Sequence, residues 1–367
     1  GNTQGIGRVF RNALAANASV AVLLTAVMYT VYCFVDKLGQ PEELLPHIRP
    51  YFVLQLISLL FIMLFNGFRQ FAEGLTDTRT PMWILLGGNA LNIFGNYLLI
   101  YGSFGFPEWG LFGAGVSTLV SRIVMLLVFI GVVAVARRYK VYREAILRSR
   151  FNRNDFMQLN ALGWPIALQM GMETAAFSLS AIMVGWLGSI PLAAHQIMIS
   201  VSTIGFMVYY GMGAALAVRV SHFMGQKDFP NLRRAVNSGM GIILSLAIVA
   251  SLFFYLARTP IIYSFTEDHE VMIVVSSLIF SLIVYQFGDA LQITFANALR
   301  GTTDVKPMMW IAFFSYFIVA LPVGYLCGFT WGGGVVGVWV AFPAGLFTAG
   351  FLFWLRFRYR LQQLMKK

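Results

Sequence analysis

Two carboxylates, Glu173 and Asp289, lie deep inside long apolar stretches of the chain, whereas the other acidic residues stand near the ends of such stretches. A carboxylate in the hydrocarbon core of a membrane is unfavourable by roughly 2.5–3.5 kcal/mol or more, and such residues usually line a path for ions or substrates. Two carboxylates around one cavity repel each other, and a single proton or Na⁺ between them relieves the repulsion. The pair therefore indicates cation transport, with Glu173 and Asp289 as the metal ligands if the coupling ion is Na⁺.

Polar residues accompany both acids at helical spacing. Tyr285 precedes Asp289 by four residues and Gln169 precedes Glu173 by four, so each residue shares a helical face with its acid. We expect Gln169 to line the same cavity as Glu173. The alternatives are structural: Glu173 could hydrogen-bond to backbone freed by a kink at Pro165, and Tyr285 could simply pack in the membrane interior.

Other polar residues also interrupt the apolar stretches. Asn92 and Asn96 stand four apart, and amides at this spacing either offer carbonyl oxygens to a cation or form hydrogen bonds between helices. Arg122 falls near the middle of its stretch, where a guanidinium requires partners, so we expect a structural pair, with substrate contact as the alternative. For His195 we expect a satisfied structural histidine rather than a titrating group.

The elements that must position these residues are membrane-spanning helices. Hydrophobic residues make up 58% of the chain and charged residues only 11%, which excludes a soluble globular domain. Apolar stretches long enough to cross the hydrocarbon core as helices are predicted at ten places. They cover residues 12–36, 47–70, 82–103, 110–136, 157–187, 191–222, 231–257, 271–299, 308–329 and 335–357.

Basic residues are distributed unequally between the two sides of this predicted membrane protein. If the first loop is assigned to the cytoplasm and the sides then alternate, 22 of the 26 Lys and Arg residues fall on the inner side. This is the positive-inside pattern, so the net charge of +11 indicates membrane topology rather than nucleic-acid binding. The most basic segment lies within residues 137–156 and is predicted to be a cytoplasmic linker that rests on anionic lipid.

An internal repeat relates the two halves of the chain. Gly74, Thr76 and Asp77 recur 227 positions later as Gly301, Thr303 and Asp304, and GLFGAGV at 110–116 resembles GVVGVWV at 334–340. A repeat of six helices keeps the same orientation in the membrane, so the repeat is parallel. We therefore expect two six-helix bundles, of which this chain carries the last ten helices. The expected parts are an N-terminal lobe at 1–136, the linker at 137–156 and a C-terminal lobe at 157–367.

Several stretches of the chain resemble the multidrug and toxic compound extrusion (MATE) family. They are GLFGAGVSTLVSR at 110–122, LAAHQIMIS at 192–200, MGQKDFPNLRRAV at 224–236 and VYQFGDALQITFANALRGTTD at 284–304. The resemblance covers essentially the whole chain in the correct order. It implies a V-shaped fold around a central cavity and export of amphipathic, often cationic compounds in exchange for Na⁺ or H⁺.

The resemblance also implies roles for individual residues. In the family a Glu at the place of Glu173 belongs to a cation site, and the matching Tyr and Asp, here Tyr285 and Asp289, lie beside it. Thr118 occupies a place that the family uses in a first-lobe site, together with the region of Asn92 and Asn96. We expect a monomer in the plasma membrane, the inner membrane of a bacterium, with its basic loops and C-terminus in the cytoplasm and the lipid bilayer and a small organic cation as its partners. Apart from the coupling ion we expect no cofactor.

Two alternatives to a drug antiporter remain at this level. One is a lipid-linked oligosaccharide flippase of the same superfamily, which would need a more cationic cavity for phosphate groups. The other is an ion channel or receptor, and a channel would need a continuous polar lining along its pore. An enzyme is not expected, since the chain contains no GxxxxGK[ST], HExxH or GxSxG motif and its four histidines are scattered.

Overall fold

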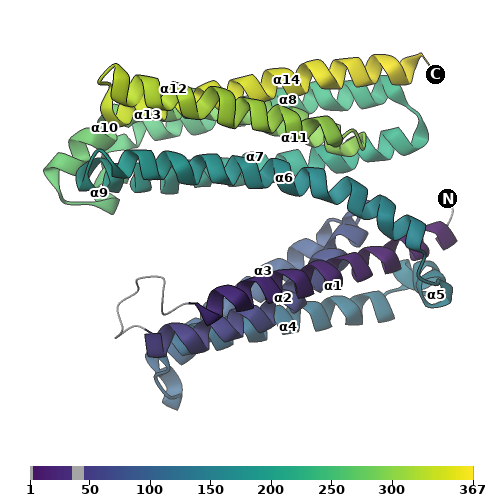
Figure 1. Ribbon diagram of the computed structural model, residues 1–367. Helices are drawn as coiled ribbons and strands as arrows, with labels where there is room; N and C mark the ends of the chain where they lie inside the picture. The colour runs from purple at the N-terminus through teal and green to yellow at the C-terminus, as the bar shows by residue number, and fades with distance from the viewer. Residues whose placement is uncertain (1–2, 35–44, 367) are drawn as a thin grey trace. The chain divides into compact units, whose positions relative to one another are not determined.

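The structure, a computed structural model, describes residues 3–34 and 45–366 (Figure 1). Within these residues every regular element is a helix, and ten helical segments are long and apolar enough to cross a membrane. The prediction of an all-helical membrane protein with many spans is thereby confirmed. The chain divides into two compact parts, a first unit, Gly1–Ala161, and a second unit, Leu162–Lys367. The last two residues of the predicted helix at 12–36 lie outside the described residues.

Four long helices form the body of the first unit. They are α1 (Thr3–Cys33), α2 (Leu45–Gly74), α3 (Arg79–Tyr101) and α4 (Gly110–Val135), with the short η3 (Ser103–Gly105) after α3. Helix α2 packs against α1 and α4, and α3 packs against α4. Their shared core is aromatic: Phe65 and Phe129 are fully buried, and Phe10 stacks on Phe71 with ring centroids 4.2 Å apart.

The segment that follows α4 returns to pack on α1. It contains η4 (Arg137–Tyr139) and α5 (Lys140–Arg148), and α5 contacts α1. The approach requires glycine, because a Cβ on Gly7 would stand 2.6 Å from the carbonyl carbon of Ala145. Part of the predicted linker is therefore a short helix packed against the first unit.

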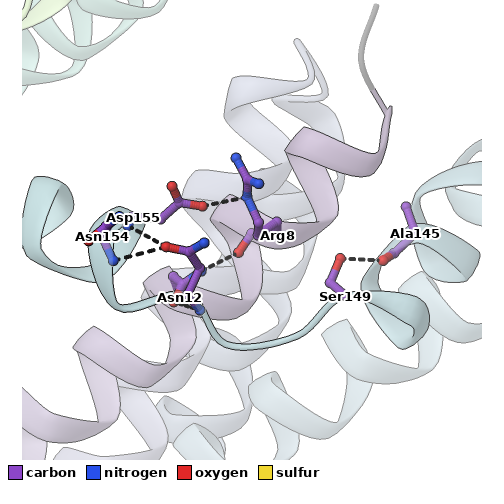
Figure 2. A network of polar contacts seen from close by, with 7 residues as sticks. Arg8, Asn12, Ala145, Ser149, Asn154 and Asp155 are labelled. Carbon is purple, nitrogen blue, oxygen red and sulfur yellow. Dashed lines mark hydrogen bonds and ion pairs between the residues drawn. The ribbon is translucent and has the colours of Figure 1, made fainter.

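Polar contacts continue this packing up to the start of α6 (Arg153–Gly185). Arg8 Nε lies 2.6 Å from Asp155 Oδ2, and Figure 2 shows the two side chains facing each other. Asn12 is fully buried, donates to the Arg8 carbonyl at 2.9 Å and accepts a hydrogen bond from the Asn152 amide at 3.1 Å. These contacts attach the first turn of α6 to the first unit.

The second unit contains the remaining helices. They are the rest of α6, then α7 (Ser189–Gln226), α8 (Phe229–Leu256), α9 (Arg258–Phe265), α10 (His269–Gly301), α11 (Lys306–Phe313), η5 (Phe314–Ala320), α12 (Leu321–Tyr325), η6 (Leu326–Thr330), α13 (Gly334–Trp339) and α14 (Ala341–Met365). The stretch predicted as one helix at 308–329 is continuous in the structure, but η5 and η6 within it have π-helical hydrogen bonding. Short α5 and α9 were not predicted, because they are too short to span a membrane.

Helix α10 is the centre of the second unit. It packs against α7, α8 and α14, and every residue from 292 to 299 is buried. A helix that is buried over much of its length is mostly apolar, so a charged residue on it such as Asp289 stands out in the sequence. Its start is defined by Asp268, whose carboxylate accepts a hydrogen bond from the Glu270 amide at 2.9 Å.

Large apolar side chains cover the outer surfaces of both units. Ile93 is 70% exposed, Trp83 67% and Phe280 75%. A protein in water would not expose apolar residues so extensively, whereas lipid tails accept them. The exposed residues therefore agree with a membrane protein.

The sequence repeat corresponds to the same local structure in both units. Thr76 and Thr303 have positive φ angles of 63° and 58°. The amide of the next residue reaches back to the preceding helix in each case, from Asp77 to Ala72 O at 2.9 Å and from Asp304 to Leu299 O at 3.1 Å. The repeated Gly-x-Thr-Asp motif is thus a repeated turn at the end of a long helix.

Each repeated aspartate binds an arginine of its own unit, though not an equivalent one. Asp77 pairs with Arg138 and accepts hydrogen bonds from Tyr139 Oη at 2.5 Å and Thr80 Oγ1 at 2.6 Å. Burial raises the pKa of the Asp77 carboxyl, but the hydrogen bonds from Arg138, Thr80 and Tyr139 outweigh it and hold that pKa well below its ordinary value. Burial, and then the bond to Asp77, raise the pKa of Tyr139 to about 12. In the second unit, Asp304 forms a bidentate pair with Arg356 at 2.6 and 3.0 Å.

Candidate functional site in the second unit

A pocket of about 280 Å³ lies between α6, α7 and α10 of the second unit. Its lining combines eight apolar or aromatic residues with seven polar or charged ones, and a site for an organic ligand needs both kinds of residue. The residues from α6 and α10 recur at intervals of three or four, so each helix presents one face. The lining comprises Met170, Glu173, Thr174, Phe177, Ile199, Ser202, Thr203, Phe206, Tyr210, Tyr285, Gln292, Ile293, Ala296, Asn297 and Arg300.

Glu173 is the acidic residue of the pocket wall. Its Oε2 accepts hydrogen bonds from Gln169 Nε2 at 3.0 Å and from Gln292 Nε2 at 3.2 Å. It makes these contacts with side chains rather than with backbone freed at Pro165, which was the structural alternative. Two amides on two helices therefore fix the carboxylate at the surface of the pocket, where a cation can reach it.

Gln169 joins Glu173 to a basic residue. It is fully buried, and while its Nε2 donates to Glu173 its Oε1 accepts a hydrogen bond from Arg300 Nη2 at 2.8 Å. Gln169 thus lies behind the pocket wall rather than in it. Arg300 lies one residue beyond the predicted helix at 271–299 and would therefore belong to a loop. In the structure it stands in the last turn of α10, is half-buried and lines the pocket. Arg300 reaches the pocket because of the helical spacing of α10, in which residues 285, 292, 293, 296, 297 and 300 share one face.

Asp289 lies deeper than Glu173. It is only 1% exposed, its Oδ2 has no hydrogen-bond partner in the part of the chain that the structure describes, and it is within electrostatic range of Glu173. Tyr285 lines the pocket one turn away on α10, and its ring is 5% exposed and packs edge-on against Phe177 at 6.3 Å. The structure thus brings Glu173, Asp289, Tyr285 and Gln169 into one neighbourhood. A carboxylate buried without a partner strongly favours uptake of a cation or a proton.

Tyr316 belongs to the same neighbourhood, although the sequence did not suggest it. It lies on the π-helical η5, is 2% exposed and is within electrostatic range of Glu173 and Asp289. Its hydroxyl and that of Ser315 have no hydrogen-bond partner of standard geometry. The only available signal was two adjacent hydroxyl residues within an apolar stretch, and π-helical turns occur frequently at functional sites.

A cation in this neighbourhood would be held by oxygen atoms. Among the described residues no three His, Cys, Asp or Glu side chains cluster as transition-metal ligands do. The available donors are the two carboxylates, the unpaired Oε1 of Gln292 and the Tyr316 hydroxyl. Oxygen donors of this kind suit a hard cation such as Na⁺, and the carboxylates equally suit a proton.

The polar residues of the first unit form a separate cluster between α3 and α4. Asn96 donates to Asn92 Oδ1 at 3.3 Å, and Asn92 donates to Ser117 and Thr118 hydroxyls, each at 3.4 Å. Ser117, which the sequence analysis did not select, returns a hydrogen bond to the Asn92 carbonyl at 3.0 Å. Amides and hydroxyls here connect two helices, and one oxygen, Asn96 Oδ1, is buried without a donor.

Arg122 and His195 have structural partners. Arg122 of α4 donates to Ser58 Oγ and to Gln55 Oε1 on α2, so its guanidinium is held between two helices. His195 is 1% exposed and accepts a hydrogen bond from Trp339 Nε1 at 3.1 Å. Both contacts agree with the structural interpretation of these residues.

Comparison with known proteins connects this chain to a transporter family. The MatE family model matches residues 1–98 and 165–326. The chain is 34% identical to the multidrug resistance protein PmpM of Pseudomonas aeruginosa over 97% of its own length and 76% of that protein. It is 28% identical to the probable multidrug resistance protein NorM of Photorhabdus laumondii, covering 99% of this chain and 81% of that protein. The fold resembles that of an outward-facing multidrug resistance MATE family transporter with a TM-score of 0.85 and 18% identity, over 100% of this chain and 85% of that one.

Proposed function

The chain belongs to the MatE family, and on that premise we propose that it is a secondary active antiporter that exports amphipathic or cationic organic compounds in exchange for Na⁺ or H⁺. The curated relatives are multidrug resistance proteins, which supports drug-like substrates. The observation that carries the proposal is the apolar pocket with Glu173 in its wall and the unpaired Asp289 within electrostatic range. An organic cation finds both an apolar surface and a counter-charge there.

The same two carboxylates explain how ion and substrate are coupled. A proton or Na⁺ that binds at Glu173 and Asp289 removes the negative charge that attracts an organic cation. Ion and substrate then compete for one charge, and competition is sufficient for exchange when the two states of the transporter face opposite sides. Tyr285 and Tyr316 contribute hydroxyl groups beside the carboxylates, and Gln169 and Gln292 hold Glu173 in place.

We further propose that the protein acts as a monomer in the plasma membrane, with the basic loops and the C-terminus on the cytoplasmic side. The unequal distribution of Lys and Arg supports this orientation. The small polar cluster around Asn92, Asn96 and Thr118 is proposed as a helix-joining group that assists the first unit, with its unpaired Asn96 oxygen as the atom available to a cation.

The two alternatives have less support. A flippase for lipid-linked phosphates would need a predominantly basic pocket, whereas this pocket region carries two carboxylates and one arginine. The naming of the curated relatives also favours drug export over lipid transport. A channel would need a continuous polar lining, but most residues around this pocket are apolar or aromatic.

Dye transport in proteoliposomes tests the proposal. Purified protein is reconstituted, and uptake or release of a fluorescent organic cation is followed while a Na⁺ gradient and a pH gradient are imposed separately. We expect one of the two gradients to drive transport and Glu173→Gln to reduce that transport to the level of empty liposomes. Transport that ignores both gradients would contradict an antiporter, and single-channel currents without saturation would favour the channel alternative.

A further inference from the structure

The pocket contains a fixed positive charge as well as its acids. Of the fifteen residues that line it, Glu173 is the one carboxylic acid and Arg300 the one base. Arg300 Nη2 donates to Gln169 Oε1 at 2.8 Å and Nη1 approaches Asn297 Oδ1 at 3.5 Å, while Nε has no partner. The guanidinium is half-buried and not matched by an ion pair, so its charge acts on the pocket.

The side-chain amide of Gln169 lies between the two charges and keeps them apart. It accepts from Arg300 with one amide atom and donates to Glu173 with the other, so the guanidinium is held near the carboxylate without neutralising it through a direct ion pair. Glu173 therefore remains available to a second cation. At the same time Arg300 offsets part of the negative potential that Glu173 and Asp289 would produce together.

We infer that Arg300 is a specificity-determining residue that selects singly charged over doubly charged organic cations, an inference that rests on the proposed function. Two acids alone would attract a dication, because each positive charge would find its own carboxylate. With Arg300 in place, the guanidinium offsets the charge of one of the two carboxylates. A second positive charge on the substrate then meets the guanidinium rather than a carboxylate.

Equilibrium binding of two related dyes tests this inference. Ethidium and propidium share one fluorescent ring system, but ethidium carries one positive charge and propidium carries two. Fluorescence polarisation with the purified full chain in lipid nanodiscs gives a Kd for each dye, and the measured quantity is the ratio of propidium Kd to ethidium Kd. The difference in dye size cancels when this ratio is compared between variants.

We expect Arg300→Gln to lower the ratio by about tenfold, since one unit charge is removed several ångströms from the site. Arg300→Lys keeps the charge and should leave the ratio within about twofold of the wild type. The matched control is Arg219→Gln, which removes the same charge from an exposed position on α7 outside the pocket and should not change the ratio. The double variant Glu173→Gln/Arg300→Gln restores the original net charge and should move the ratio back towards the wild type.

Each other outcome overturns the inference. An unchanged ratio in Arg300→Gln protein that elutes as a folded monomer would assign Arg300 a purely structural role. An equal change in Arg300→Lys would show that shape rather than charge determines the preference. Failure of the proposed function has a different signature: ethidium would bind equally well to wild type, Glu173→Gln and Asp289→Asn, whatever the Arg300 variants do.

Discussion

The two units differ in how the polar groups of their membrane-length helices are hydrogen-bonded. In the first unit, Asn92, Asn96, Ser117 and Thr118 bond mainly to one another across α3 and α4, and among its described residues no carboxylate lies in the middle of a membrane-length helix. In the second unit, Asp289 Oδ2 is buried without a hydrogen-bond partner. The first arrangement leaves one neutral amide oxygen, Asn96 Oδ1, without a donor, whereas the second leaves a carboxylate oxygen to be satisfied by a bound cation or proton.

This difference separates a role in stability from a role in transport. Neutral amides and hydroxyls between helices contribute about 0.6 kcal/mol per contact on average and do not require a ligand. A buried carboxylate without a partner is costly, so its environment favours a bound cation or proton. We therefore expect substitutions in the two clusters to affect different measurements.

The largest effect is expected at Asp289. Asp289→Asn removes a buried negative charge at nearly constant shape and should reduce gradient-driven dye transport at least about hundredfold, because ion and substrate lose a shared ligand. Asn92→Ala in the first unit should keep transport within about threefold of the wild type, because the amide mainly joins two helices. Proteoliposome assays at matched protein content provide the measurement. Equal losses in both variants would remove the distinction between the units.

A smaller effect, on stability, is expected at Asp77. Asp77→Asn disrupts bonds to Arg138, Tyr139 and Thr80 and should lower the free energy of unfolding by about 2–3 kcal/mol. Because the folded-state pKa of Asp77 lies below its ordinary value of 3.8, the carboxylate stabilises the fold above that ordinary value, and the effect is lost as pH falls towards the folded pKa. The difference in thermal stability between wild type and variant should be constant from about pH 8 to 5 and shrink below about pH 4.

The related aspartate of the second unit serves as the comparison for that result. Asp304 pairs with Arg356 in bidentate geometry, but none of the tyrosines that the structure describes donates to it as Tyr139 does to Asp77. Asp304→Asn should therefore destabilise the protein less than Asp77→Asn. A larger loss at Asp304 would show that the arginine pair, and not the additional hydroxyl donors, dominates in this turn.

Ser117→Ala should lower the free energy of unfolding by about 1 kcal/mol. Its side chain is 3% exposed and donates to the Asn92 carbonyl at 3.0 Å, so Ser117→Ala leaves that interhelical contact unmade. Thermal unfolding monitored by size-exclusion chromatography measures the change, with exposed Ser221→Ala as the control. Dye transport by the Ser117 variant should remain close to the wild type, and a strong loss of transport would assign this cluster a place in the ion path.

The smallest effect is expected at the repeated turns, and it is stabilising. Thr76 and Thr303 are exposed, and both adopt the left-handed conformation that β-branched residues disfavour. Glycine relieves this strain, although it also increases the conformational entropy of the unfolded chain. Strain relief is the larger of the two effects, so Thr76→Gly and Thr303→Gly should each raise the free energy of unfolding by about 0.5–1 kcal/mol. Thermal melts that fall in either variant would mean that the threonine side chain makes a contribution larger than the strain.

Several parts of the fold followed directly from local sequence. Ten long helices were predicted at nearly the right places, because about twenty apolar residues in succession can satisfy their backbone in lipid only as a helix. The recurrence of Gly74 and Asp77 at Gly301 and Asp304 predicted an internal repeat, and the structure has the same turn at both places. The π-helical turns around Tyr316 were not predicted, because they arise from packing and have no clear sequence signature.

The candidate site was predictable only in part. Glu173 and Asp289 were evident because an acid in an apolar stretch is unusual whatever surrounds it. Arg300 was assigned to a loop, since near a helix end a basic residue fits either a loop or a pocket and its sequence neighbours do not distinguish them. Ser117 and Tyr316 carry common side chains whose importance depends on which helix lies opposite.

The sequence alone determined what kind of molecule this is: an all-helical membrane protein with a repeated half and two acids that hydrocarbon would not tolerate without a function. These properties depend on composition and spacing along one helix, which the chain carries in itself. Tertiary structure alone decided which groups face each other, including the bridge from Arg300 through Gln169 to Glu173 and the burial of Asp289 behind the pocket wall. The physical reason is that charge and hydrogen bonding act over a few ångströms in space, whereas Gln169 and Arg300 are 131 residues apart in the chain.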